Sequence, residues 1–194
     1  MQRNSRSCRR QEVLGLALLV FVGIQTVMVD RAKAAEPAAK DKAFTISSSN
    51  FSSGGEIPKK FSCDDSDVSP ELSWTGAPAG VRSFAVIADD PDAPAGTWTH
   101  WVLFDLPPQT TELPEGVPKV DEVPTGGRQG RNDFGKIGYN GPCPPPGKPH
   151  RYFFKLYALD QMLNLKPGAS KREVEQAMQG HVLGKAELTG KYRR

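Results

Sequence analysis

From residue 43 onward, short apolar runs alternate with stretches rich in proline and glycine, a pattern typical of antiparallel β proteins. The runs that we predict to be strands are 44–46, 59–61, 72–74, 83–88, 100–104 and 151–159. The last run has aromatic and aliphatic side chains in both of its alternating sets, which predicts a central strand buried on both faces. The pattern therefore predicts a mainly β domain.

One segment near the C-terminus has the pattern of a helix instead. Ser170 and Glu173 have the spacing of a capping box. Val174 and Met178 then fall on one apolar face, and Gly180 marks the end of the segment. We expect this helix to be peripheral and to cover an edge of the sheet.

The first 34 residues differ in character from the rest. Four arginines within residues 1–10 precede an almost uncharged apolar run at 13–29, and the small residues Ala32 and Ala34 follow it. This order predicts a secretory signal peptide that is cleaved after residue 34. An uncleaved membrane anchor is the weaker alternative, because a run of this length is at the lower limit for a membrane span.

Cleavage of this signal peptide would change the charge of the protein. Residues 1–34 contain six Lys or Arg and two Asp or Glu, a net charge of +4, whereas the whole chain has +3. The other 160 residues therefore carry −1, and we expect no nucleic-acid-binding surface on them. We expect residues 35–42 to form a flexible tail and residues 43–194 a single domain. The expected location is periplasmic or secreted, and the export route, Sec or twin-arginine, is left open.

The first motif with candidate chemistry follows the predicted strand 83–88. Strand alternation places Asp90 on the same face as Val86 and Ala88. A carboxylate at the end of an apolar face is partly desolvated and needs a partner. The alternative is a solvated Asp-Pro turn. His100 lies at the start of the next predicted strand.

The second motif is a loop with five prolines between residues 142 and 149. Proline fixes the backbone and removes N–H donors, so that the N–H groups of Gly141 and Cys143 are the ones that we expect to be available to a ligand. His150 and Tyr152 follow, two residues apart, and project to the same face of the next strand. The alternative is a stiff connection in which the histidine is structural.

Taken together, these motifs resemble those of the phosphatidylethanolamine-binding protein (PEBP) family, most of all its bacterial and archaeal Raf kinase inhibitor-like branch. The matching segments are 69–74, 90–94, 100–101, 141–145 and 150–152, and the resemblance spans about residues 43–190. It implies a mainly β fold, a β sandwich of two sheets with one or two short peripheral helices. It also implies a pocket at one end of the sandwich for phosphate or a phosphoryl-ethanolamine-like head group.

The resemblance also implies which residues form this pocket. They are Asp90, Pro91, Asp92, His100, Gly141, Pro142, Pro144, His150 and Tyr152. Two imidazoles, a phenol and backbone N–H groups are donors for phosphate oxygens. An aspartate among them would repel a phosphate unless it is protonated, orients a histidine or meets the ammonium group of ethanolamine.

We therefore expect a non-enzymatic binding protein, without cofactor or metal, for phosphate or a phosphoethanolamine-like ligand. A protein partner that it modulates, a peripheral membrane contact and a homodimer are left open. One alternative is a hydrolase or phosphoryl-transfer enzyme that uses Asp90, His100 and His150, although no serine lies in a nucleophile-elbow motif. A metal site that adds Asp92 to these three residues is another, although no tight ligand spacing supports it. A structural or inhibitory protein with an idle pocket is the third.

Two cysteines, Cys63 and Cys143, lie beyond the predicted signal peptide. Export would place them where disulfides persist. Cys143 belongs to the proline loop, and Cys63 to a polar loop just ahead of the segment 69–74. We predict a disulfide between them that ties the two loops together at one end of the domain.

Overall fold

The structure is a computed structural model that describes residues 42–194. The predicted signal peptide (1–34) and the predicted tail (35–42), except for its last residue, lie outside the described residues. The strands are β1 (Thr45–Ser47), β2 (Leu72–Thr75), β3 (Ser83–Asp90), β4 (Trp98–Leu106), β5 (Glu112–Leu113), β6 (Arg128–Gln129), β7 (His150–Leu159) and β8 (Val182–Tyr192). The helical elements are the 3-10 turn η1 (Lys59–Phe61) and the helix α1 (Lys171–Met178). Neither of these two is long and apolar enough to cross a membrane.

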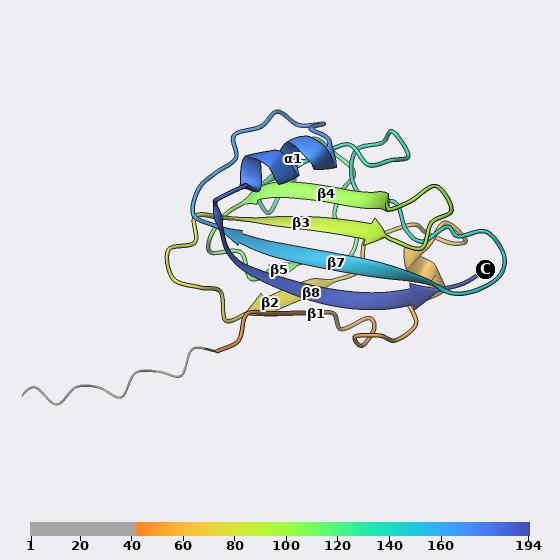
Figure 1. The fold of residues 1–194 in the computed structure, drawn as a ribbon. Coiled ribbons are helices and arrows are strands. Elements are labelled where there is room, and N and C mark those ends of the chain that lie inside the picture. Colours follow the sequence, from red (N-terminus) through yellow and green to blue (C-terminus); the bar gives the residue numbers. More distant parts are fainter. Residues whose placement is uncertain (1–41) are drawn as a thin grey trace, which may run out of the picture. The chain divides into compact units, whose positions relative to one another are not determined.

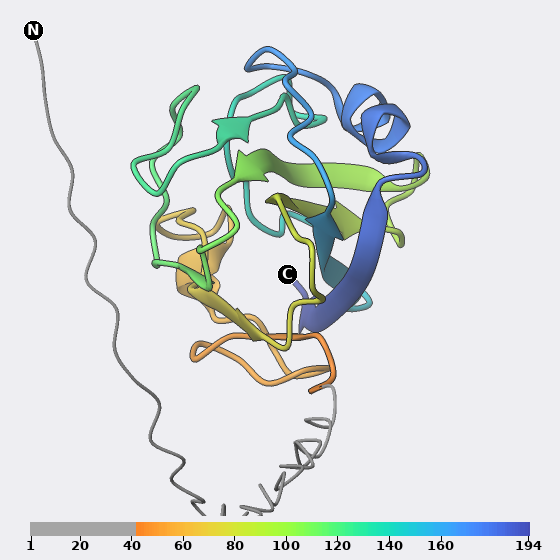
Figure 2. The ribbon, with the colours of Figure 1, turned by 90° about the vertical axis from the view of Figure 1, so that its left-hand side faces the viewer.

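The strands form two antiparallel sheets with a core between them. The smaller sheet has the order β1-β2-β5 and the larger the order β6-β4-β3-β7-β8 (Figure 1). Both sheets contribute to the core, with side chains that include Ile46, Leu72, Trp74, Phe84 and Phe154. Figure 2, turned so that the strands run towards the viewer, shows the orange and yellow segments of the smaller sheet below the green and blue strands of the larger one. The predicted mainly β sandwich is thus confirmed.

Five of the six predicted strands are present, as β1, β2, β3, β4 and β7. The prediction for residues 59–61 is wrong, because this segment forms the 3-10 turn η1. The carbonyl of Pro58 accepts the N–H of Phe61, and of the three turn residues only Phe61 is buried. A single buried side chain does not provide the alternation on which a strand depends.

Strand β7 lies between β3 and β8 and is central in the larger sheet, as predicted. Its inner set, which includes Tyr152 and Phe154, is buried in the core. Its outer set is only half-buried, as at Phe153 and Tyr157. The prediction of a strand buried on both faces is therefore confirmed for the inner face and only in part for the outer one.

The sequence pattern does not predict the longest strand, β8. Its inward positions include Gly184, Ala186 and Gly190, which are weak β formers and conceal the alternation. Gly190 is nevertheless required, because a Cβ atom at this position would collide with the side chain of Ile57. The strands β5 and β6 have two residues each and are too short to give a pattern.

Helix α1 begins with the predicted capping box, in which Ser170 Oγ accepts the N–H of Glu173 and the Glu173 carboxylate accepts the N–H of Ser170. The buried Val174 and Met178 pack with Ile87 on the outer side of the larger sheet. The helix therefore covers a face of this sheet, close to β4, and not an edge as predicted (Figure 1). The reason is that β3 and β4 carry apolar side chains on their outer face as well, and these need a cover.

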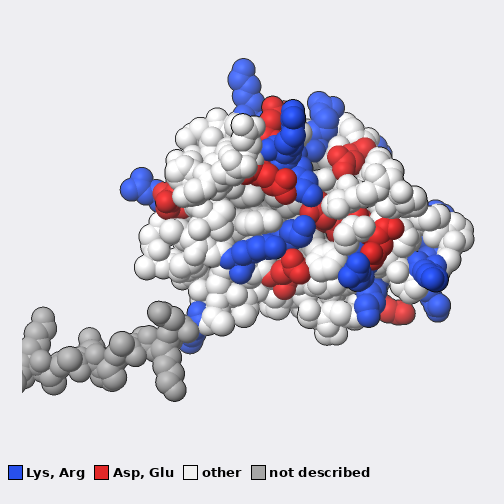
Figure 3. All heavy atoms as spheres, in the orientation of Figure 1, with Lys and Arg blue, Asp and Glu red and all other residues white. Residues whose placement is uncertain are grey.

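The same outer face holds a charged cluster around the buried Asp89. Oδ2 of Asp89 lies 2.8 Å from Nζ of Lys155 and 2.8 Å from Nζ of Lys171. Because Lys171 belongs to α1, the cluster ties the helix to the sheet. Figure 3 shows acidic and basic side chains side by side on this face.

Candidate ligand-binding pocket

A β-bulge in the pair β3–β4 sets the direction of His100. Ala88 pairs with Trp101, but the next residue of β3, Asp89, pairs with Thr99, so that His100 has no partner across the pair. A bulge bends the strand and turns a side chain towards a new direction. As a result, the His100 ring packs edge-on against the inward-facing Tyr152, with 5.2 Å between the ring centroids.

The end of β3 places Asp90 next to the first residue of β7, His150. Nδ1 of His150 lies 2.8 Å from Oδ2 of Asp90, and because a carboxylate only accepts, this nitrogen carries the proton. The other oxygen, Oδ1, accepts the N–H of Asp92 at 2.8 Å. The Asp90 side chain is only 4% exposed. Of the three roles that the sequence leaves open for an aspartate, the structure therefore shows that of orienting a histidine.

His100 is held in the same way, through a different acceptor. Its Nδ1 lies 2.7 Å from the carbonyl oxygen of Asn140, to which it donates. Burial lowers the pKa of His100, and this effect outweighs the nearby carbonyls of Asn140 and Gly141 and the Asp90 carboxylate, which raise it. At neutral pH, His100 is therefore a neutral imidazole whose Nε2 carries no proton.

Tyr152 lies on the core side of His100 and packs against its ring. Its hydroxyl is buried and makes no hydrogen bond within residues 42–194. Burial and, next, the negative charge of Asp90 raise the pKa of Tyr152 well above its usual range. The ring backs the imidazole of His100, but Tyr152 is not one of the residues that line the cavity described below.

Asp92 and Pro91 do not line the cavity either. The Asp92 carboxylate accepts from Arg151, at 2.9 Å from the backbone N–H and at 2.7 and 2.9 Å from two guanidinium nitrogens. These hydrogen bonds lower the pKa of Asp92 to about 2. Pro91 is exposed at the turn between β3 and β4.

Hydrogen bonds to the segment that follows η1 fix the proline loop. The N–H of Gly141 donates to Oδ1 of Asp67 at 2.6 Å, and the Pro142 carbonyl accepts the N–H of Cys63 at 3.1 Å. The prediction that the Gly141 N–H is available to a ligand is therefore wrong. Asp67, which has a backbone φ of 52°, also accepts a hydrogen bond from Nδ2 of Asn140 at its Oδ2, at 2.9 Å. No sequence pattern pointed to Asp67.

The predicted disulfide between Cys63 and Cys143 is present, with 5.4 Å between the Cα atoms. It joins the same two segments as the hydrogen bonds of Asp67 and Pro142. The wall of the pocket is thus tied covalently to the loop after η1.

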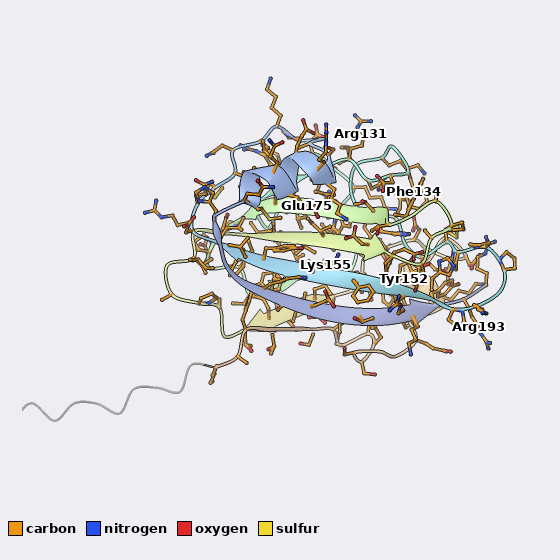
Figure 4. All side chains as sticks on the ribbon, in the orientation of Figure 1. Arg131, Phe134, Tyr152, Lys155, Glu175 and Arg193 are labelled. Carbon is orange, nitrogen blue, oxygen red and sulfur yellow. A yellow bond between two sulfur atoms is a disulfide. The ribbon has the colours of Figure 1, made fainter. Side chains whose placement is uncertain are left out.

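These side chains surround a cavity of about 360 Å³. Its lining consists of Asp90, Ala93, Pro94, Ala95, Trp98, His100, Phe134, Cys143, Pro144, Pro145 and His150. The structure therefore brings together Asp90, His100, Pro144 and His150 from the predicted set. Sequence reasoning missed Phe134, which comes from a polar loop without a strand pattern; Figure 4 shows it at the same end of the larger sheet as Tyr152.

The alternatives with catalytic or metal chemistry find little support in this geometry. Within residues 42–194, His100 and His150 hydrogen-bond to a carbonyl and a carboxylate, not to a hydroxyl or thiol that would act as a nucleophile. The one cysteine of the lining, Cys143, is in the disulfide. No group of three or more His, Cys, Asp or Glu in the described part of the chain is arranged to hold a metal ion.

A family model described as phosphatidylethanolamine-binding protein matches residues 47–193. The chain belongs to the phosphatidylethanolamine-binding protein family. This confirms the resemblance seen in the sequence motifs. The family name describes a binding protein.

Two similar proteins come from archaea. A UPF0098 protein of Methanothermobacter thermautotrophicus is 56% identical over 144 residues, which are 74% of this chain and 95% of the relative. The UPF0098 protein PH1269 of Pyrococcus horikoshii is 55% identical over 182 residues, 92% of this chain and 87% of the relative.

Two solved PEBP structures share the fold. Escherichia coli YbcL, described as a member of the mammalian PEBP family, has a TM-score of 0.73 and 35% identity. The PEBP homologue CT736 of Chlamydia trachomatis has a TM-score of 0.72 and 39% identity. Each similarity covers 78% of this chain and 98% of the other one.

A larger cavity, of about 450 Å³, lies beside this PEBP pocket, between the segment Glu56–Lys59 and the end of β8. It approaches the pocket through Pro149, which precedes His150. Four of its five titratable side chains, those of Glu56, Lys59, Lys191 and Arg193, are exposed, and the fifth, Tyr192, is half-buried and hydrogen-bonds to Ser62 and Asp64. We place the candidate site at the smaller cavity, because the buried side chains of Asp90 and His100 and the largely buried His150 line it together.

Proposed function

We propose that this protein binds a small phosphorylated head group, such as phosphate or phosphoethanolamine, in the pocket of Asp90, His100 and His150, and that it does not convert it chemically. The observation that carries this proposal is that two imidazoles line one cavity and that each is fixed through Nδ1, which leaves Nε2 for a ligand. An imidazolium at either position donates to a phosphate oxygen through a charge-assisted hydrogen bond.

The proposal predicts moderate affinity at neutral pH. Among residues 42–194, neither lysine nor arginine lines the pocket, so the positive charge that meets the phosphate has to come from the histidines. Burial disfavours this charge at His100. A ligand that carries a cation of its own offsets the negative charge of Asp90, which favours a zwitterionic head group over free phosphate.

We also propose that the protein is exported and acts in the periplasm or outside the cell. The Cys63–Cys143 disulfide supports an oxidising compartment. The predicted signal peptide agrees with this proposal.

Calorimetry with inorganic phosphate and with phosphoethanolamine tests the binding site. His150→Ala removes one charge-assisted donor and should weaken both ligands about 10- to 150-fold. His181→Ala is the matched control: its Nδ1 is also paired with an aspartate, Asp160, at 2.9 Å, but the residue does not line the pocket. Equal affinities for the two variants would place the site elsewhere, and release of phosphate from phosphoethanolamine would show turnover.

A further inference from the structure

The ammonium group of a phosphoethanolamine-like ligand would find few hydrogen-bond acceptors in this pocket. A primary ammonium has three N–H donors, each of which needs an acceptor once water is removed. Asp90 is the acidic residue of the lining, but both of its oxygens already accept, from His150 and from the N–H of Asp92. Asp92 itself is turned towards Arg151. A carboxylate has about four lone-pair sites, so Asp90, whose side chain is only 4% exposed, has at most two left for the three N–H donors of an ammonium.

The wall beside His100 is aromatic instead. The ring centroids of Trp98 and Phe134 are 5.5 Å apart and their planes meet at 79°, so that the two rings form a corner. Phe134 also lies 5.2 Å from the His100 ring, at 70°. All three rings line the cavity, and the wall continues through alanine and proline side chains, which offer no side-chain acceptor.

Phe134 is held at this corner by hydrogen bonds of its loop and not by burial in the core. It is 37% exposed, and its N–H donates to Oδ1 of the buried Asn132 at 3.0 Å. The preceding residue, Asp133, exchanges two hydrogen bonds with Thr99 of β4, of 2.6 and 3.0 Å. These bonds fix the backbone that carries the ring, and the ring itself packs against Trp98 and His100, which lowers the entropic cost of using it to bind a ligand.

We infer that the corner of Trp98 and Phe134 receives a methylated ammonium group, and that the pocket prefers a phosphocholine-type head group to phosphoethanolamine. A trimethylammonium has no N–H donor to leave unsatisfied, and its positive charge is attracted to the faces of aromatic rings. The inference rests on the proposed function, because the phosphate of the same ligand would lie at His100 and His150.

Three ligands separate the contributions of charge, shape and N–H donors. Phosphocholine carries the methylated cation, phosphoethanolamine the primary ammonium, and 3,3-dimethylbutyl phosphate has the shape of phosphocholine with a neutral carbon in place of the nitrogen. Calorimetry should show phosphocholine binding about 3- to 30-fold more tightly than either of the others.

Variants of the corner locate the effect. Trp98→Leu and Phe134→Leu keep an apolar side chain but remove the ring, so each should reduce the preference for phosphocholine over the neutral analogue, which is the ratio of two affinities measured on the same variant. Phe153→Leu, on the outer face of β7, is the matched control and should leave the preference unchanged.

The outcomes for the inference and for the proposed function differ. If phosphoethanolamine or the neutral analogue binds as tightly as phosphocholine, the inference is wrong; if His150→Ala still weakens inorganic phosphate in that case, the proposed function stands. If none of the phosphates binds to the unmodified protein, both are wrong. The supporting result is a preference for phosphocholine that Trp98→Leu and Phe134→Leu both reduce.

Discussion

Nδ1 of His150 lies 2.8 Å from Oδ2 of Asp90, across the paired strands β7 and β3. His181 and Asp160 form a pair of the same type at 2.9 Å. The two pairs differ in exposure: the side chains are 12% and 4% exposed for His150 and Asp90, but 39% and 44% for His181 and Asp160. The protein therefore contains its own control for the effect of burial on a histidine–aspartate pair.

We predict a coupling between His150 and Asp90 of about 1.5–3 kcal/mol in the free energy of unfolding. His150→Ala leaves a buried carboxylate without its charge-assisted partner, and Asp90→Asn in the same chain removes that carboxylate charge. The double variant should therefore be more stable than the sum of the single changes indicates. Urea unfolding of the single and double variants measures the coupling.

The same cycle on His181 and Asp160 should give less than about 1 kcal/mol, because water screens an exposed pair. Equal coupling in the two cycles would show that burial does not strengthen the interaction at the pocket.

The lowered pKa of His100 predicts a pH dependence of anion binding. An anion in the pocket favours the imidazolium form of His100. Burial disfavours this form and lowers the pKa of His100 below the ordinary histidine range. Affinity for sulfate, which stays dianionic between about pH 8 and pH 5, should therefore still rise as the pH falls below about 6.5. His100→Asn, which preserves a donor for the Asn140 carbonyl, should remove this part of the rise. Calorimetry across the pH range measures it, and a profile unchanged in His100→Asn would contradict the assignment.

Without an anion, His100 should make folding less favourable in acid. Its pKa is lower in the folded protein than in the unfolded chain, so the unfolded chain binds more protons below about pH 6.5. The stabilisation that follows from this difference in pKa is therefore fully present above this pH. It is lost as the pH falls from the pKa of His100 in the unfolded chain to its pKa in the folded protein. Thermal unfolding at a series of pH values should show a loss that is smaller in His100→Asn.

The disulfide should stabilise the fold more than it shapes the pocket. Cys63 and Cys143 are 80 residues apart, and closing a loop of this length corresponds to about 4 kcal/mol in the chain-entropy account. The double variant Cys63→Ser/Cys143→Ser should lose up to this amount in urea unfolding. Its phosphate affinity should change by less than about 3-fold, because Asp67 still holds the pocket loop. Two free thiols in the untreated protein, or unchanged stability of the variant, would contradict this.

The sequence predicts those parts of the fold that depend on strong local patterns. The strands β3 and β7 and the capping box at Ser170 are examples, and all are present. The strand β8 is not predicted because small residues fill its inner face, and its pairing depends on contacts that are distant in sequence. Prediction from pattern fails where tertiary contacts outweigh local preference.

At the pocket, the motifs identify which residues come together but not what each of them contacts. Asp90, His100 and His150 do meet. Asp92 and the Gly141 N–H were expected at the ligand and instead bind Arg151 and Asp67. Such pairings depend on a bulge and on loop conformations, and residue spacing contains no information on either.

Gly141 shows most directly how the pocket loop depends on a close backbone contact. A Cβ atom at this position would collide with the carbonyl oxygen of Phe61 and lie 2.8 Å from Cα of Ser62. Both are backbone atoms, so the clash can be relieved only by moving the loop, at a cost of about 3 kcal/mol. Gly141→Ala should therefore lower the free energy of unfolding by about this amount.

The displaced loop should also weaken phosphate binding, because Pro144 and Pro145 of the same loop line the pocket. Pro146→Ala, at an exposed position of this loop, should stay within about 0.5 kcal/mol of the unmodified protein and is the control. Urea unfolding and calorimetry with phosphate measure the two effects. If Gly141→Ala is as stable as Pro146→Ala, the loop has room to move and its close approach to Phe61 does not position the pocket.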